Sequence, residues 1–310
     1  MAGSGQKLAR AVSFAKRSVP AARRRVSDAW AGEWRIGFRL PKARPISPDR
    51  VAPLTDDEPV ATPDPGGPRL ATGRRFAASW SDEAVPEEMG GPEPVANPLW
   101  QDFAHHEEGP GIFKWEHYFD VYHRHLAQFV DRPVNVVEIG VYAGGSLGMW
   151  QRYFGADAHI YGVDIEPACR RYERDNVSIF IGDQQDRSFW AAFKADVPYI
   201  DVVIDDGGHT PLQQMVTLEE LVPQLRPGGV YVCEDVHGMD NPFIAYASGL
   251  VDALNEWHPV TEPDLASPTS SFQRSVHSIH FYPYLLVIEK HERTPPRFVA
   301  PRHGSEWQPF

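Results

Sequence analysis

Short apolar segments that alternate with helical patterns between residues 134 and 290 constrain the fold of this chain most strongly. Each segment is rich in β-branched residues and has the length of a buried strand. Strands are predicted at residues 134–140, 159–165, 177–183, 200–206 and 229–235. Helices are predicted between them, one ending near Phe154 and others spanning about 211–225 and 242–257. This order is typical of a parallel sheet covered by helices on both faces.

The C-terminal segment 278–290 is also strand-like, with a break near Tyr282–Pro283 that predicts an antiparallel hairpin at one edge of the sheet. We therefore predict an α/β fold with a doubly wound, mostly parallel sheet of seven strands. Before the first strand, residues 115–130 predict a helix. Its apolar face would carry Trp115, Phe119, Tyr122, Leu126 and Phe129. The histidines of this helix, His117, His123 and His125, are expected to be surface or hydrogen-bonded residues.

Residues 1–96 differ from the rest in composition. The first 50 residues contain twelve Lys and Arg against three acids, and residues 44–98 are rich in Pro, Gly and acids. Such segments bury too little apolar area to fold, so a mostly disordered basic arm and linker is predicted, with a docked piece around 74–80. A membrane-surface segment and an organelle transit peptide are alternatives for residues 1–43. The folded domain is predicted at 97–310.

Composition excludes several classes of protein. The net charge of −12 argues against a nucleic-acid binder. The two cysteines exclude a disulfide framework and fit a reducing compartment, so a cytoplasmic location is expected. No apolar run is long enough for a transmembrane helix. A homo-oligomer remains possible.

Carboxylates lie at the carboxyl ends of the predicted strands. They are Glu138, Asp164, Asp183, Asp205, Asp206, Glu234 and Asp235. In sheets of this kind, ligands bind at the carboxyl ends of the strands. Like charges packed together are costly unless a cation or hydrogen-bond donors offset them. The acids are therefore expected to face one cleft, although Asp206 and Asp235 could instead be helix caps.

The loop after the first strand indicates the type of ligand. Glycines at this place let a ligand approach the backbone closely. Their spacing is G-x-x-x-G-G, which differs from the G-x-G-x-x-G of dinucleotide enzymes. Glu138 just before the loop would repel a pyrophosphate and suits a cationic ligand. Asp164 could accept hydrogen bonds from two ribose hydroxyls, and Asp183 could reach an exocyclic amine. S-adenosylmethionine fits this pattern.

Five motifs carry a resemblance to a known family: VEIGVYAGGSLGMW, IYGVDI, IGDQQD, VVIDDGGH and GGVYVCED. Over residues 134–290 the chain resembles class I S-adenosylmethionine-dependent methyltransferases, which have a Rossmann-like fold. More narrowly, it is similar to the metal-dependent sugar O-methyltransferases of the macrocin and mycinamicin type. The resemblance covers about half of the chain, and it departs at Gly208, where the family commonly has Ser.

The resemblance implies a role for each matching residue. Asp206, Glu234 and Asp235 would bind a divalent cation, Mg²⁺ in particular, and His209 would be the general base. The methyl donor would be held by Glu138, Gly140, Gly144, Ser146, Asp164, Asp183 and Asp205. The acceptor would be a hydroxyl of a sugar or another glycosylated natural product.

General chemistry supports this assignment. A hard cation lowers the pKa of a hydroxyl group bound to it, and oxygen ligands favour Mg²⁺ over Zn²⁺. His209 follows Asp206 by three residues and could accept the hydroxyl proton near neutral pH. His237 is the alternative base, and His209 could instead be structural. The stretch 109–115 could cover the cleft or be an ordinary loop.

Three other functions remain open. The wider group includes proteins labelled cephalosporin hydroxylase, so the domain could bind the same cofactor for different chemistry. It could also be a non-catalytic module that binds a partner through the basic arm. A nicotinamide oxidoreductase is disfavoured by the glycine spacing.

Overall fold

The computed structural model describes residues 68–79, 96–238, 241–256, 266–267, 269–301 and 303–305. The chain divides into two units, residues 1–87 and 88–310. In the first unit, one helix is described, α1 (Pro68–Ala77), and residues 73–79 are exposed. This helix overlaps the docked piece expected around 74–80. The rest of the predicted basic arm and most of the linker lie outside the described residues.

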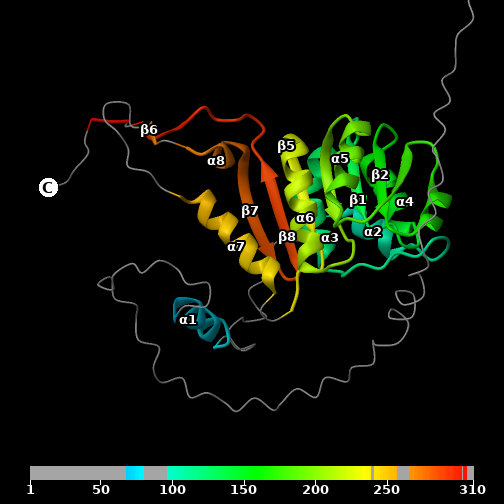
Figure 1. Cartoon of the computed structure of the whole chain (residues 1–310), viewed down its shortest axis with the longest axis horizontal. Coiled ribbons are helices and arrows are strands. Elements are labelled where there is room, and N and C mark those ends of the chain that lie inside the picture. Colours follow the sequence, from blue (N-terminus) through cyan, green and yellow to red (C-terminus); the bar gives the residue numbers. More distant parts are fainter. Residues whose placement is uncertain are drawn as a thin grey trace, which may run out of the picture. The chain divides into compact units, whose positions relative to one another are not determined.

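A seven-stranded sheet forms the centre of the second unit (Figure 1). Its strands are β1 (Asn135–Ile139), β2 (His159–Asp164), β3 (Val177–Ile181), β4 (Ile200–Asp205), β5 (Leu225–Cys233), β7 (Val276–Tyr282) and β8 (Leu285–Lys290). They are arranged in the order β3-β2-β1-β4-β5-β8-β7. The first five are parallel, and β7 and β8 form an antiparallel hairpin that pairs with β5. The predicted sheet is therefore confirmed. A separate short pairing joins β6 (Ala266–Ser267) to β9 (Phe298–Val299).

Helices cover both faces of the sheet, as predicted. The buried strands carry apolar side chains on both faces, so each face needs a cover. One core contains residues of α2 (Pro98–Ala104), α3 (Tyr118–Leu126) and α4 (Gly145–Phe154). The other contains residues of α5 (Arg187–Asp196), α6 (Pro211–Leu221) and α7 (Pro242–Leu254). The remaining described helices are α8 (Ser271–Ser275) and the 3₁₀ turns η2 (Ala127–Phe129), η3 (Pro167–Tyr172) and η4 (Val222–Gln224). None of the described helices has the length and apolar character needed to cross a bilayer.

The helix predicted at 115–130 begins later than expected. Trp115 was placed on its buried face, but Trp115 precedes α3 and is 51% exposed. Tyr118, at the start of the helix, is fully buried instead. The three histidines are hydrogen-bonded, as predicted. His125, for example, contacts Glu289 through Nδ1 and Tyr282 through Nε2.

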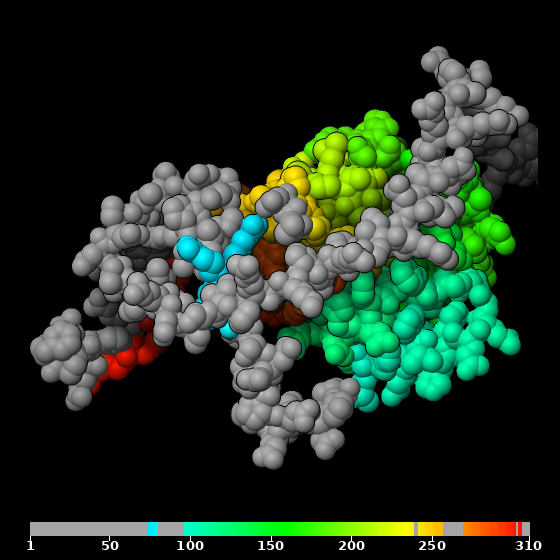
Figure 2. Space-filling model, turned by 90° about the horizontal axis from the view of Figure 1, so that it is seen from below, coloured from blue at the N-terminus to red at the C-terminus, as the bar shows by residue number. Residues whose placement is uncertain are grey.

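The segment that precedes β1 packs on the face of the sheet that carries α4. Figure 2 shows residues 96–126, in teal, as a continuous surface on one side of the domain. Asn97 anchors its start, since its side chain caps α2 and donates to the carbonyl oxygen of Phe119. This packing brings the loop between α2 and α3 to the carboxyl ends of the strands.

Candidate active site

The strand order places the predicted acids along one edge of the sheet. β1 is flanked by β2 and β4, and β4 is flanked by β5, so the ends of these parallel strands are neighbours. Main-chain hydrogen bonds continue just beyond the strands, from Asp206 N to Ile139 O and from Glu234 N to Asp205 O. These bonds fix the backbone of both acidic pairs.

The pleat of the strands separates the acids of the first pair. Successive side chains point to opposite faces of a sheet. Asp205 therefore points with Tyr231 toward the α6 face, where its carboxylate accepts from Tyr231 Oη and Gln184 Nε2. Asp206 points to the other face, where it approaches Glu234 through a shared lysine. Burial raises the pKa of Asp205 to about 7.

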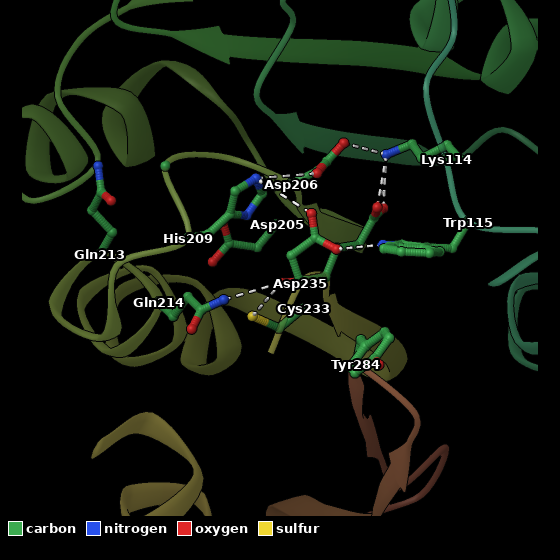
Figure 3. Close-up of polar contacts among 12 residues, drawn as sticks. Lys114, Trp115, Asp205, Asp206, His209, Gln213, Gln214, Cys233, Asp235 and Tyr284 are labelled. Atoms are coloured by element: carbon green, nitrogen blue, oxygen red, sulfur yellow. Dashed lines mark hydrogen bonds and ion pairs between the residues drawn. The ribbon is translucent and has the colours of Figure 1, made fainter. Parts of the chain in front are cut away.

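Lys114 is the central residue that sequence analysis missed. Its Nζ lies 2.5 Å from Asp206 Oδ2, 2.8 and 3.0 Å from the two oxygens of Glu234, and 4.0 Å from Glu138 Oε1. Its side chain is only 2% exposed. Figure 3 shows it entering from the loop before α3, between the strand ends. The signals in the sequence were indirect: clustered acids require a cation, and the stretch 109–115, which contains Lys114, was a candidate cover of the cleft.

The environment of this lysine is strongly charged. Burial alone would lower the pKa of Lys114, but the carboxylates of Asp206, Glu234 and Glu138 raise it well above its usual range. Burial raises the pKa of Glu138 to about 7. The Glu138 carboxylate accepts from Ser146 Oγ and Trp150 Nε1, both at 2.9 Å. Glu138 and Ser146, both predicted to hold the methyl donor, therefore bind each other in the interior.

His209 lies on the open side of the same cluster. Its Nε2 is 3.8 Å from Asp206 Oδ1 and 3.6 Å from Asp235 Oδ2. One ligand atom from each of Asp206, His209 and Asp235 lies within 4.8 Å of the other two, a spacing that could hold a metal ion. The backbones of His209 and Asp235 have positive φ, 57° and 53°. A left-handed conformation is uncommon outside glycine, although His and Asp adopt it more readily than most residues, and such conformations concentrate at functional sites.

Neighbouring elements hold these side chains in place. A capping box formed by Thr210 and Gln213 starts α6 directly after His209. Asp235 Oδ1 accepts from Trp115 Nε1 at 3.1 Å and from Tyr118 Oη at 2.9 Å. Within the described residues, no hydrogen-bond partner is found for the buried Nδ1 of His209. The rival base His237 is exposed, and its ring packs 5.7 Å from that of Tyr284.

The predicted donor-binding acids lie at the ends of β2 and β3. Asp164 Oδ2 accepts from the amides of Val141 and Tyr142, at 2.9 and 3.0 Å, so it shapes the glycine loop. Its Oδ1 accepts from the amide of Glu166. Asp183 is exposed, and among the residues that the structure describes its carboxylate accepts one hydrogen bond, at Oδ1 from the amide of Gln185. Both carboxylates can still accept hydrogen bonds from a ligand. Asp164 has less capacity for them than Asp183, because three main-chain amides already donate to it.

The glycines of this loop are required by the protein itself. A Cβ at Gly140 would lie 2.0 Å from the carbonyl oxygen of Asp206, and one at Gly144 would lie 2.6 Å from the ring of Tyr172. A Cβ at Gly145 would lie 2.4 Å from the carbonyl oxygens of Pro110 and Gly111. Sequence analysis had explained these glycines by the approach of a ligand. The contacts show that close packing already requires them, and that residues 110–111 lie against the start of α4.

Gly208, where the family commonly has Ser, lies beside the same network. Its amide donates to Gln184 Oε1 at 2.7 Å, and a Cβ would lie 2.2 Å from Gln213 Nε2. The capping glutamine thus occupies the space that a serine side chain would need. The difference does not change the spacing of three residues between Asp206 and His209.

Comparison with known proteins supports the resemblance. Residues 137–236 match a family model described as a methyltransferase domain. The chain is 36% identical over 202 residues to an 8-demethyl-8-α-L-rhamnosyl tetracenomycin-C 2′-O-methyltransferase of Streptomyces olivaceus, covering 58% of this chain and 52% of the relative. It is 30% identical over 200 residues to the mycinamicin VI 2″-O-methyltransferase of Micromonospora griseorubida, covering 57% and 49%. The chain thus spans about half the length of these curated relatives.

A solved structure agrees with these relatives. MycE methyltransferase from the mycinamycin biosynthetic pathway, in complex with Mg, SAH and mycinamycin VI, matches with a TM-score of 0.51 and 26% identity. The match covers 64% of this chain and 54% of that one. The resemblance inferred from the sequence motifs is therefore confirmed. Residues 137–236 match a methyltransferase domain, and the chain is similar to sugar O-methyltransferases of the macrocin and mycinamicin type.

Proposed function

We propose that this domain transfers a methyl group from S-adenosylmethionine to a hydroxyl group of a glycosylated acceptor. The observation that carries the proposal is the cluster of Asp206, His209 and Asp235 at the carboxyl ends of β4 and β5. A general base and two carboxylates with free oxygens meet there, next to the loop that follows β1. This is the arrangement that removal of a hydroxyl proton requires.

The residues present fit a hard divalent cation. Asp206 Oδ1 and Asp235 Oδ2 are carboxylate oxygens on the open side of the cluster, the ligand type that Mg²⁺ prefers. Glu234 is the third acid of the predicted ligand set, and both of its oxygens contact Lys114. A bound Mg²⁺ would lower the pKa of the acceptor hydroxyl. The relatives' complexes with Mg support this assignment.

His209 is the proposed general base. As the hydroxyl oxygen forms its bond to the methyl carbon, the carbon–sulfur bond breaks and the hydroxyl proton passes to His209 Nε2. The products are the methyl ether and S-adenosylhomocysteine. Asp206 and Asp235 lie 3.8 and 3.6 Å from Nε2, so the base lies beside the oxygens assigned to the cation. The αL backbone of His209 sets the direction in which its side chain leaves the main chain.

Donor binding is assigned to the other half of the edge. Asp164 and Asp183, at the ends of neighbouring strands, would accept from the ribose hydroxyls and the adenine amine. Gly140 and Gly144 would shape the loop beneath the methionine part of the donor. Glu138 supports the end of that loop through Ser146, and Asp205 is held by Gln184 and Tyr231. Calorimetry measures the donor's affinity, and the assignment predicts weaker binding in Asp183→Ala.

The acceptor is assigned to an aromatic surface beside Asp235. Phe113, Trp115 and Tyr284 are 92%, 51% and 44% exposed. The rings of Trp115 and Tyr284 lie 5.6 Å apart (Figure 3), and Trp115 also bonds Asp235. Exposed aromatic faces next to polar groups are typical of sites that bind partly apolar ligands such as glycosides.

The experiment is a methylation assay with glycosylated polyketides as acceptors, in which S-adenosylhomocysteine release and product mass are measured. The proposal predicts a mass gain of one methyl group, which is lost in Asp206→Ala. A product that gains oxygen instead would favour the cephalosporin-hydroxylase-like alternative. Donor binding with no turnover on any acceptor would favour the non-catalytic module.

A further inference from the structure

A second group of side chains with metal-binding atoms lies on the β7–β8 hairpin. Its members are His125 of α3, His280 of β7 and Glu289 of β8, and one ligand atom from each lies within 4.8 Å of the other two. Leu285 and Val287, which alternate with Glu289 along β8, belong to the core that also contains residues of α3. Alternate residues of a strand share a face. The group therefore lies between α3 and the hairpin.

The carboxylate of Glu289 lies between the two imidazole rings. Its Oε1 is 2.7 Å from His125 Nδ1, and its Oε2 is 3.4 Å from His280 Nε2. The centroids of the two rings are 4.8 Å apart. At the usual zinc–nitrogen and zinc–oxygen distances, two ligands of a tetrahedral ion are about 3.3 Å apart. The contact with His280 already has this separation, and the contact with His125 has to widen by roughly 0.6 Å.

Neighbouring hydroxyl groups orient two of these side chains. Tyr282 Oη lies 2.9 Å from His125 Nε2, and Ser278 Oγ donates to Glu289 Oε2 at 2.8 Å. In the tautomer with its proton on Nε2, His125 donates to Tyr282 and keeps a free lone pair on Nδ1. A metal-binding histidine normally has such a partner on its other ring nitrogen. Without an ion, the same atoms are joined by hydrogen bonds.

The donor atoms and their exposure indicate which ion would bind. Two imidazole nitrogens and one carboxylate oxygen favour Zn²⁺ over Mg²⁺, and three protein ligands leave one position for water. His125 is 5% exposed, whereas the side chain of His280 is 36% exposed, so an ion can enter from solvent. No spacing motif reveals the group in the sequence, because Glu289 lies 164 positions from His125.

We propose that His125, His280 and Glu289 bind a Zn²⁺ ion that joins α3 to the β7–β8 hairpin. This site is separate from the candidate active site. Glu289 pairs with Val230 of β5, and Asp235 follows Val230 by five residues, so the two sites are roughly 16 Å apart. The inference does not depend on the proposed methyl transfer.

Calorimetric titration of Zn²⁺ into the full-length, chelator-treated chain tests this proposal. Excess Mg²⁺ is present throughout, to compete for the carboxylates at the strand ends. His280→Gln removes one ligand from a half-buried position. We expect one Zn²⁺ per chain to lose at least about tenfold in affinity, since the loss of a group that merely orients a ligand already costs about 10- to 100-fold.

His159→Gln is the matched control. His159 is also half-buried on a strand and also contacts a serine hydroxyl, Ser178 Oγ, at 2.9 Å. It lies on β2, outside the proposed site, so this variant should keep the wild-type affinity for Zn²⁺.

X-ray absorption of the wild type loaded with one equivalent of Zn²⁺ is a second measurement, which decides the question even if His280→Gln does not fold. The proposed site supplies two imidazole ligands, whereas the group at the strand ends supplies one, from His209. One imidazole per zinc, no Zn²⁺ binding by the wild type, or equal affinities of the wild type and a folded His280→Gln would overturn the proposal. An equal loss in His159→Gln would do the same. The proposed function would stand in each case, because it uses other residues.

Discussion

Gly140→Ala is expected to damage the junction between β1 and β4. The new Cβ would lie 2.0 Å from the carbonyl oxygen of Asp206, and φ at this position is +92°. Relief of the overlap requires the end of β4 to move away from β1, which disturbs the 3.0 Å hydrogen bond from Asp206 N to Ile139 O. Asp206 would move with it, so cation binding should weaken as well.

Gly109→Ala is the control that separates the cost of backbone strain from the cost of steric overlap. Gly109 has nearly the same φ, +95°, but its Cβ would meet nothing within 4 Å. A left-handed alanine costs about 1–2 kcal/mol, and this cost is common to both variants. Overpacking adds about 1–3 kcal/mol, and a weakened hydrogen bond adds about 1 kcal/mol. Gly140→Ala should therefore be less stable than Gly109→Ala by about 2–4 kcal/mol.

Urea unfolding of both variants, monitored by circular dichroism, gives this difference directly. If the free energies of unfolding of Gly140→Ala and Gly109→Ala differ by less than about 1 kcal/mol, the strand ends can separate without cost. The close approach of β1 to Asp206 would then not be what requires the glycine.

Three further predictions concern the site and the fold. Asp206→Ala should lose Mn²⁺ binding in a spectroscopic titration but keep its affinity for S-adenosylmethionine; retained Mn²⁺ binding would contradict the assignment. His209→Ala should lower turnover by about 100- to 10,000-fold in the methylation assay, with the donor's affinity unchanged, and a similar loss in His237→Ala alone would transfer the role to that residue. The hydrogen bond from His125, with smaller contributions from other groups, lowers the pKa of Glu289 to about 2. The wild type's advantage in stability over Glu289→Gln should therefore be complete above about pH 4.5 and decline as the pH falls toward 2; urea unfolding at several pH values measures it, and an advantage that does not change with pH would refute it.

The arrangement of the sheet could be predicted because its signals are local. Apolar, β-branched runs mark the strands, and the acids after them mark the edge where ligands bind. The position of His209 also followed, since it is only three residues beyond Asp206. These inferences needed no knowledge of which residues distant in the chain meet.

Long-range contacts could not be predicted. Lys114 lies 92 positions from Asp206 in the sequence and 120 from Glu234, and no local pattern links them. Trp115 was placed in the core because its spacing fits a helical face, but α3 begins three residues later and the indole instead reaches Asp235. The glycine loop was read as space for a ligand, whereas neighbouring backbone and Tyr172 already fill that space.

The most direct test of the account is calorimetric titration of S-adenosylmethionine into the full-length chain, with and without Mg²⁺, and with NAD in a parallel experiment. The account predicts one donor-binding site per chain and no binding of NAD. A separate titration with Mg²⁺ should give a heat of binding that disappears in Asp206→Ala. A protein that binds NAD, or that binds no S-adenosylmethionine in either condition, would contradict the claim that these strand ends form a methyltransferase site.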